Sequence, residues 1–128
     1  MPKFDVSVSL GSEGYRTDVT TRGHVDHADL DAKSGGIGAY ATPEETVLGA
    51  LGSCTAMTLT LYARRKGWAL THVDVKVTLG EEGLQRAVTV TGDLQPDQVE
   101  RLLEMAYKCP VHKMLTTPPA MTSTIARA

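Results

Sequence analysis

The sequence contains few aromatic residues and few cysteines, and it lacks a strong charge of either sign. Among 128 residues it has one Phe, one Trp, four Tyr and two Cys. A core with so few rings must consist of Leu, Val, Ala and Met. The net charge of −2 and the pI near 6.0 argue against the basic surface by which proteins bind nucleic acid. Apolar residues make up 41% and charged residues 22%, which is typical of a globular protein rather than a disordered one.

The chain also lacks the segments that direct proteins to membranes. No apolar run without charges approaches the ~20 residues of a membrane span, and the N-terminus MPKFDVSVSL lacks the apolar region of a signal peptide. We therefore expect a cytoplasmic protein with no membrane partner. In that compartment two cysteines seldom form a permanent disulfide, so catalysis, redox sensing or metal binding are the alternatives. The length predicts one domain, residues 1–128.

Three strands are expected before the first helix. Residues 3–10 alternate cleanly, with Phe4, Val6, Val8 and Leu10 on one face, as in a half-buried strand. The segments YRTDVTT and HVDHADL are two further strands. The glycine-rich segment DAKSGGIGAYA that follows lacks the spacing and the Lys-Ser/Thr ending of a phosphate loop. We interpret it as a surface loop.

A long helix is expected from Pro43 to about Lys66. Thr42 is suited to the N-cap and Glu45 to the third helical position, which together form a capping box with proline at the start. Gly67 is the expected residue just after the helix end.

This helix is expected to be central and buried, because no charge lies between Val47 and Tyr62. So apolar a helix is difficult to bury within one small chain. We therefore expect a homodimer in which a face of small residues lies against the same helix of the second chain. That face consists of Gly49, Ala50, Gly52, Ser53 and Ala56.

The rest of the chain predicts a hairpin, a helix, a short helical turn and a last strand. Residues 72–92 alternate on both sides of GEEG, and residues 96–108 are amphipathic. Residues 109–115 restart a helical turn, and residues 118–128 are expected to form an edge strand after two prolines. The order βββ-α-ββ-α-β predicts an α+β fold with a mostly antiparallel sheet wrapped on the long central helix.

The two cysteines have different local surroundings. Cys54 lies in mid-helix among small residues, where burial as a small apolar side chain is the simplest interpretation. Cys109 precedes Pro110 and is expected at an N-cap, where backbone amides lower the pKa of a thiol. The segment CPVH has a metal-ligand spacing, with His24 and His27 as possible partners. Structural zinc normally takes four ligands in paired short spacings, so we predict no metal site.

The segments TPEETVLGALGSCTAMTLTLYARRKGW and CPVHKML carry a family resemblance. Together they resemble the osmotically inducible protein C and organic hydroperoxide resistance (OsmC/Ohr) family, in its shorter OsmC-like branch. The resemblance extends from YRTDVTTRGH to the last predicted strand. It implies an intertwined homodimer with sites at the subunit interface and a thiol-dependent peroxidase activity without a cofactor.

The resemblance also implies the roles of four residues. Cys54 matches the cysteine that attacks the peroxide, and Cys109 matches the resolving cysteine that forms an intramolecular disulfide with it. A dithiol reductant then restores both thiols. Glu44 matches a carboxylate before the first cysteine, and Arg22 matches an arginine of the first hairpin. Arg16 is close enough to leave the choice of arginine open.

Helix geometry constrains the role of Glu44. Ten helical residues span roughly 15 Å, so on a continuous helix Glu44 cannot contact Cys54 of its own chain. It reaches the Cys54 of a second chain if the two helices pair antiparallel across a twofold axis. The alternative is a helix that breaks near Gly49 or Gly52.

Two residues depart from the organic hydroperoxide resistance branch. Thr55 follows Cys54 where that branch has an aromatic residue, and His112 stands where it has a small polar one. These departures weaken any transfer of substrate preference. The alternative function is a non-catalytic redox sensor or a small-ligand-binding dimer of the same fold.

Overall fold

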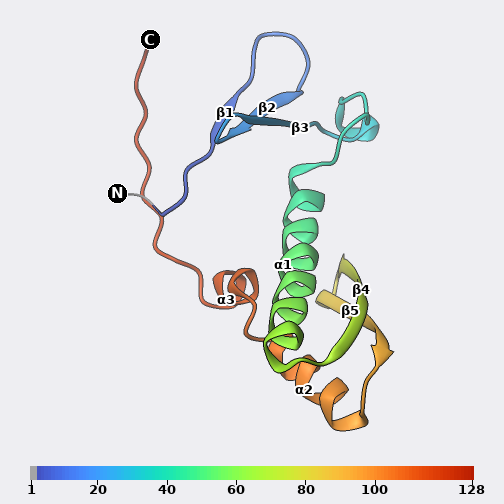
Figure 1. The fold of residues 1–128 in the computed structure, drawn as a ribbon. Coiled ribbons are helices and arrows are strands. Elements are labelled where there is room, and N and C mark those ends of the chain that lie inside the picture. Colours follow the sequence, from blue (N-terminus) through green and yellow to red (C-terminus); the bar gives the residue numbers. More distant parts are fainter. Residues whose placement is uncertain (1–2) are drawn as a thin grey trace. The chain divides into compact units, whose positions relative to one another are not determined.

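The computed structural model describes residues 3–128 (Figure 1). They belong to two compact units, the first ending at Gly49 and the second comprising Ala50–Ala128. The elements are β1 (Ser7–Ser9), β2 (Thr17–Thr21), β3 (His24–Ala28), the 3-10 helix η1 (Ala32–Ser34), α1 (Pro43–Lys66), β4 (Ala69–Gly80), β5 (Gly83–Asp93), α2 (Pro96–Ala106) and α3 (Pro110–Thr116). The order βββ-α-ββ-α-α confirms the α+β class, with one difference at the end of the chain.

The N-terminal unit contains an antiparallel sheet in the order β1-β2-β3. Arg22 and Gly23 form the β2–β3 turn with φ angles of 46° and 85°, as two-residue hairpin turns require. Strand β1 is shorter than the predicted 3–10. The predicted burial of its apolar face is wrong for the single chain, because Phe4 and Val8 are 77% and 60% exposed.

The glycine-rich segment is a surface loop, as expected, and Asp29 organises it. Asp29 is 3% exposed, and its carboxylate accepts hydrogen bonds from the amides of Leu30 (2.7 Å) and Ile37 (3.1 Å). A Cβ at Gly36 would lie 1.9 Å from the Leu30 carbonyl oxygen. Glycine is therefore required where the loop backbone passes so close to another segment.

Helix α1 begins and ends as the sequence predicts. The Glu45 amide donates to Thr42 Oγ1 (3.2 Å), and the Thr42 amide donates to the Glu45 carboxylate (2.9 Å), which completes the capping box. Gly67 follows the last turn with a φ of 70°. The helix is continuous from Pro43 to Lys66, so the alternative of a break near Gly49 or Gly52 is wrong.

In the single chain only one stripe of α1 is buried, so burial on several sides stays a prediction for the expected homodimer. The buried residues are Leu51, Thr55, Leu59 and Ala63, one on each successive turn. Met57 and Leu61, on another face, are 70% and 53% exposed. The apolar character that the sequence shows all round the helix therefore exceeds what this chain alone covers.

Helix α1 is also long and apolar enough to cross a bilayer by length and composition alone, with a mean hydropathy of 1.3 over its best window. This differs from the expectation that no such run exists. The core helix of a domain that spans no membrane passes the same test. Here α1 contributes Leu59 and Ala63 to a core that also includes residues of α2, β4 and β5.

The second unit packs the β4–β5 hairpin and α2 beside α1 (Figure 1). The hairpin is antiparallel, with Val73 opposite Val90 and Val75 opposite Val88, as the alternation predicts. Leu102 and Ala106 of α2 are 1% and 0% exposed and meet Leu59 and Ala63 of α1 in one cluster. This packing sets α1 against the segment that carries Cys109.

The end of the chain differs from the prediction. Residues 110–116 form α3 after the expected interruption, but residues 117–128 form no strand. A strand requires a neighbour whose backbone groups it can pair with, and within residues 3–128 this segment has none. Met121 and Ile125 are 90% and 99% exposed there.

Candidate functional site

The structure brings the two cysteines of the chain together. Cys54 lies in the middle of α1 and is partly exposed, whereas Cys109 is 0% exposed at the start of α3. Each thiol shifts the pKa of the other, so the two side chains lie close together, and both thiols are free. Two neighbouring thiols can be oxidised to a disulfide when their Cα atoms lie within about 7 Å.

Cys109 is the N-cap of α3, as predicted from the Cys-Pro sequence. Its sulfur accepts a hydrogen bond from the His112 amide at 3.5 Å, and Pro110 occupies the first helical position. Amides at the start of a helix point toward the capping side chain and favour negative charge there. The backbone therefore supports a thiolate at Cys109.

The two thiols have pKa values that shift in opposite directions. Burial raises the pKa of Cys54 first of all, and its hydrogen bond to Cys109 raises it further. Burial also opposes ionisation of Cys109, but hydrogen bonds from Cys54, from the amides of His112 and Val111, and from Thr55 together lower the pKa of Cys109. Because each thiol shifts the pKa of the other, the pair titrates as a unit. When the pair of thiols loses its first proton, the negative charge lies on Cys109.

Sequence reasoning missed an arginine beside this pair. Arg86 of β5 donates a hydrogen bond from Nη1 to the Thr55 hydroxyl (3.1 Å), 31 residues away along the chain. Its guanidinium also lies 5.5 Å from the centre of the Tyr107 ring, and that ring meets His112 edge-on. No local motif marks Arg86. Only the packing of β5 against α1 places Arg86 beside Thr55.

A cavity of about 240 Å³ opens beside Arg86. Its lining is Leu51, Leu84, Arg86, Leu103, Tyr107, His112, Leu115 and Thr116. The lining is mostly apolar, with one cation, one imidazole and one phenol, a mixture that suits small organic molecules.

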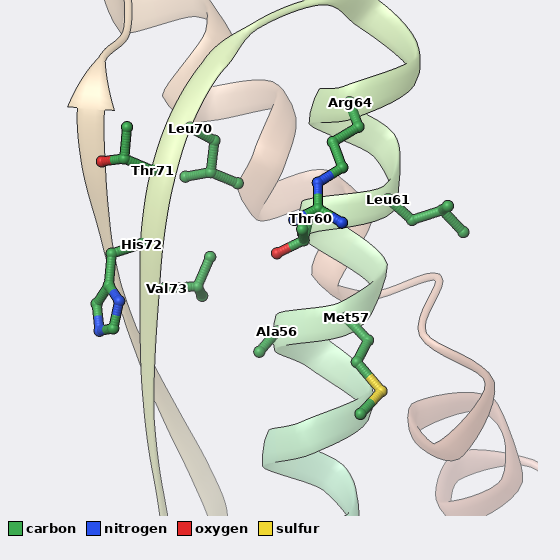
Figure 2. Close-up of a pocket in the computed structure, with 9 residues that line it drawn as sticks. All are labelled: Ala56, Met57, Thr60, Leu61, Arg64, Leu70, Thr71, His72 and Val73. Carbon is green, nitrogen blue, oxygen red and sulfur yellow. The ribbon is translucent and has the colours of Figure 1, made fainter.

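A larger cavity of about 500 Å³ lies between α1 and β4 (Figure 2). Met57, Leu61 and Arg64 line it from α1, and Leu70 and His72 from β4. The two cavities are lined by different parts of α1, because Leu51 borders the smaller one and Met57 the larger.

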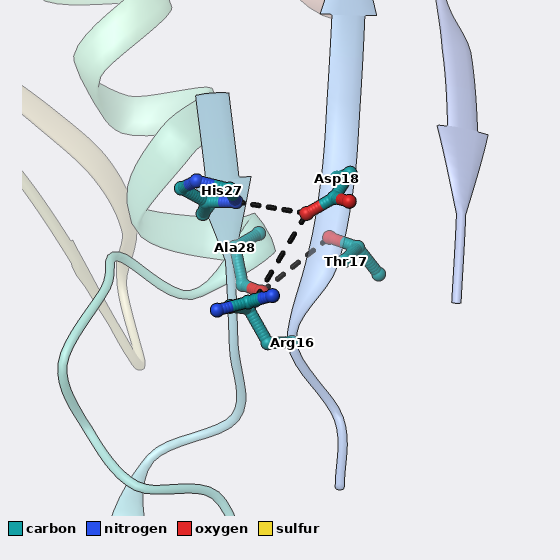
Figure 3. A network of polar contacts seen from close by, with 5 residues as sticks. All are labelled: Arg16, Thr17, Asp18, His27 and Ala28. Carbon is teal, nitrogen blue, oxygen red and sulfur yellow. Dashed lines mark hydrogen bonds and ion pairs between the residues drawn. The ribbon is translucent and has the colours of Figure 1, made fainter. Parts of the chain in front are cut away.

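The other predicted site residues belong to the N-terminal unit. Arg16 forms a long ion pair with Asp18 (3.9 Å), and Asp18 also bonds to His27 Nδ1 (3.0 Å) (Figure 3). Arg22 lies in the exposed β2–β3 turn and has no ion pair within residues 3–128. Glu44 is exposed in the first turn of α1.

Across residues 3–128, no three His, Cys, Asp or Glu side chains gather where they could hold a metal ion. His27, one of the possible ligands named from the sequence, instead contacts Asp18 and the Tyr40 ring.

Comparison with protein families identifies the fold. A model of the OsmC family, described as OsmC-like protein, matches residues 34–124. That range contains both cysteines, Glu44 and the whole of α1. The chain belongs to the OsmC-like protein family.

Solved structures of this family have the same fold. An OsmC-like protein from Mycoplasma pneumoniae superimposes with a TM-score of 0.74 at 16% identity, covering 91% of this chain and 89% of the other. An organic hydroperoxide resistance protein from Elizabethkingia anophelis gives 0.63 at 15%, covering 92% and 91%. The organic hydroperoxide resistance protein OhrB of Bacillus subtilis gives 0.55 at 19%, covering 90% and 93%. A search of curated protein sequences gives no match.

Proposed function

We propose that this protein is a thiol-dependent peroxidase that reduces organic hydroperoxides to alcohols in defence against oxidative and osmotic stress. The observation that carries the proposal is the pair of neighbouring free thiols, Cys54 and Cys109, in a chain of the OsmC-like family. The organic hydroperoxide resistance proteins of similar fold support the choice of substrate. The proposal treats residues 1–128 as one OsmC-like domain with no cofactor.

In the first step the Cys54 thiolate attacks the outer peroxide oxygen. A sulfur–oxygen bond forms, the O–O bond breaks, and the alkoxide takes up a proton and leaves as the alcohol. Cys54 is then a sulfenic acid. Its partial exposure suits this role, because the peroxide must reach the sulfur.

In the second step Cys109 resolves the sulfenic acid. The Cys109 thiolate attacks the Cys54 sulfur, a disulfide forms, and the hydroxide leaves as water after protonation. The lowered pKa of Cys109 suits a nucleophile, and its burial keeps it from the peroxide. A dithiol, such as a small thiol or a lipoyl- or thioredoxin-type protein, then reduces the disulfide.

The raised pKa of Cys54 calls for a cation near its sulfur. We assign this role to Arg22, oriented by Glu44, because Arg16 is already paired with Asp18. Ten residues of the continuous helix α1 span roughly 15 Å. Glu44 is therefore assigned to the Cys54 of a second chain, in a homodimer with antiparallel α1 helices. The proposed location is the cytoplasm.

Peroxide turnover tests the proposal. Pure protein with excess dithiothreitol should consume tert-butyl or cumene hydroperoxide continuously, and Cys54→Ser should abolish this consumption. Cys109→Ser should oxidise once and then become over-oxidised at Cys54. Arg22→Ala should lower the rate roughly a hundredfold. Arg16→Ala is the matched control and should retain the wild-type rate of peroxide consumption.

The opposite outcome favours the alternative function. A chain that oxidises once and consumes no further peroxide, despite excess reductant, is a redox sensor or a ligand-binding dimer. The raised pKa of Cys54 is the observation that favours this alternative, since a protonated thiol reacts slowly with peroxide.

A further inference from the structure

Thr55, the residue after Cys54, is held from two sides inside the second unit. It is 0% exposed, and its hydroxyl donates to the Leu51 carbonyl at 2.7 Å. A hydroxyl has a single hydrogen but can accept further hydrogen bonds at its oxygen. Arg86 Nη1 fills that acceptor position at 3.1 Å. The Thr55 oxygen is therefore held between α1 and β5. The hydrogen of the same hydroxyl can turn from the Leu51 carbonyl to a stronger acceptor.

Arg86 has no carboxylate partner within the described chain, residues 3–128. Its planar group instead lies on the Tyr107 ring, 5.5 Å from the ring centre, and borders the 240 Å³ cavity. A guanidinium in this position retains its full positive charge and a fixed orientation. Arg86 is thus a free cation next to the segment that leads into Cys109.

Cys109 is the stronger acceptor to which the Thr55 hydroxyl can donate. The sulfur is fully buried and already accepts the His112 amide, and the nearby Thr55 hydroxyl contributes to the lowered pKa of Cys109. A buried thiolate is unfavourable unless donors and positive charge surround it. The titratable or charged groups near Cys109 are Cys54 from α1, Arg86 from β5, Tyr107 and Lys108 before it, and His112 and Lys113 from α3.

We propose that Arg86 is a positioning residue that acts through Thr55 to stabilise the thiolate of Cys109, so that Cys109 is the leaving group when the Cys54–Cys109 disulfide is reduced. This inference rests on the disulfide of the proposed function. It assigns a role to Thr55, which stands where the sequence departs from the organic hydroperoxide resistance branch. It also assigns a direction to the reductive step.

The reductive step is a thiol–disulfide exchange at Cys54. A thiolate of the dithiol reductant attacks the partly exposed Cys54 sulfur, because Cys109 is 0% exposed. A mixed disulfide forms, the Cys54–Cys109 bond breaks, and its electron pair leaves on the Cys109 sulfur. The second thiol of the reductant then attacks its own bound sulfur and releases Cys54, and both protein sulfurs regain protons from solvent. A leaving thiol that ionises easily makes the first exchange faster.

Titration of Cys109 tests the inference directly. In a Cys54→Ser background Cys109 is the only thiol, and the ultraviolet absorbance of the thiolate reports its ionisation without any need for access. Arg86→Met and Thr55→Val should each move the midpoint to higher pH. Thr55→Ser keeps a hydroxyl and should therefore keep the midpoint of the unsubstituted residue. Lys76→Met, which removes an exposed cation of the same hairpin, is the control and should leave it unchanged.

The double variant separates action through Thr55 from direct attraction. Adding Arg86→Met to Thr55→Val should move the midpoint no further, because both changes remove the same interaction. An additive movement contradicts a role for Arg86 through Thr55. An unchanged midpoint in folded Arg86→Met overturns the proposal, and Thr55→Val provides the same test if Arg86→Met does not fold.

Reduction of the disulfide gives an independent kinetic readout. With both cysteines present, Arg86→Met should be reduced by dithiothreitol about threefold more slowly. A lost hydrogen bond to a charged group is worth roughly a factor of ten in equilibrium, and about half of such an effect is felt in the exchange rate. An unchanged rate in a variant whose titration midpoint has moved contradicts the assignment of Cys109 as the leaving group. The titration needs no peroxide, so failure of the peroxidase proposal is seen separately as absent turnover.

Discussion

At the scale of single residues, Cys54 and Cys109 differ in their surroundings although each shifts the pKa of the other. Burial raises the pKa of Cys54, whereas at Cys109 the surrounding donors outweigh burial and lower the pKa. The side chain that is more exposed is therefore the one less ready to ionise. Activation of Cys54 therefore calls for a cation near its sulfur, the role that the proposed function gives to Arg22.

This asymmetry predicts how stability depends on pH in the reduced protein. The lowered pKa of Cys109 means that ionised Cys109 stabilises the fold above the unfolded value near 9.0, and that this contribution is lost as pH falls through the folded pKa. The raised pKa of Cys54 has the opposite sign, since its contribution is present below 9.0 and is lost as pH rises through its folded pKa.

Denaturant unfolding of reduced wild type, Cys54→Ser and Cys109→Ser at several pH values checks this prediction. As pH rises toward 9.0, the free energy of unfolding of Cys109→Ser should fall increasingly below that of the wild type. Above 9.0, Cys54→Ser should gain on the wild type. Parallel curves for all three proteins would show that neither pKa shift exists.

The sequence predicts some of these residues and not others, for a physical reason. Cys54 and Cys109 are the only thiols, so any thiol chemistry had to involve them, and the N-cap position of Cys109 follows from the next residue, Pro110. Arg86 has no such local signal. Its contact with Thr55 depends on the packing of a hairpin against α1, which no spacing in the sequence encodes.

At the scale of elements, local chemistry determined what was predictable. The start of α1 depends on Thr42 and Glu45, which lie three residues apart, and its end depends on Gly67. The β4–β5 hairpin follows from alternation on both sides of a short turn. The prediction of a last strand was wrong, because a strand forms only beside the edge of another strand, and residues 118–128 alone do not specify that edge.

Gly92 of β5 provides an element-scale prediction. Its φ is 144°, and a Cβ there would lie 1.9 Å from the Ala69 carbonyl oxygen, beside the register shift between Leu70 and His72. Because backbone must move to admit a methyl group, Gly92→Ala should lower the free energy of unfolding by about 2 kcal/mol or more. Urea denaturation measures this change.

Gly80, at the other end of the hairpin, is the matched control. A Cβ there meets no atom within 4 Å, and its φ lies outside the positive range. Gly80→Ala should therefore be neutral or stabilise the fold by up to about 1 kcal/mol, since it reduces the freedom of the unfolded chain. Equal losses in the two variants would refute the steric argument at Gly92.

At the scale of the whole molecule, the apolar surface of α1 is the feature that one chain does not explain. The buried stripe from Leu51 to Ala63 packs within the second unit, yet Met57 and Leu61 are 70% and 53% exposed. Large exposed apolar side chains on one helix face indicate an interaction surface. The small residues of the same helix allow close approach of a second backbone. Both features favour the homodimer that the proposed function requires.

The double substitution Met57→Glu/Leu61→Glu tests the dimer. Two carboxylates on that face would be desolvated in an α1–α1 interface, so the variant should be monomeric, whereas light scattering of the wild type should give twice the chain mass of 13.7 kDa. Leu79→Glu, at an apolar position that is 58% exposed on the hairpin, should leave the mass unchanged. The monomer should also lose peroxide turnover, because Glu44 is assigned to the Cys54 of the second chain. A monomeric variant with full turnover would remove Glu44 of the partner from the site, and a monomeric wild type would contradict the dimer itself.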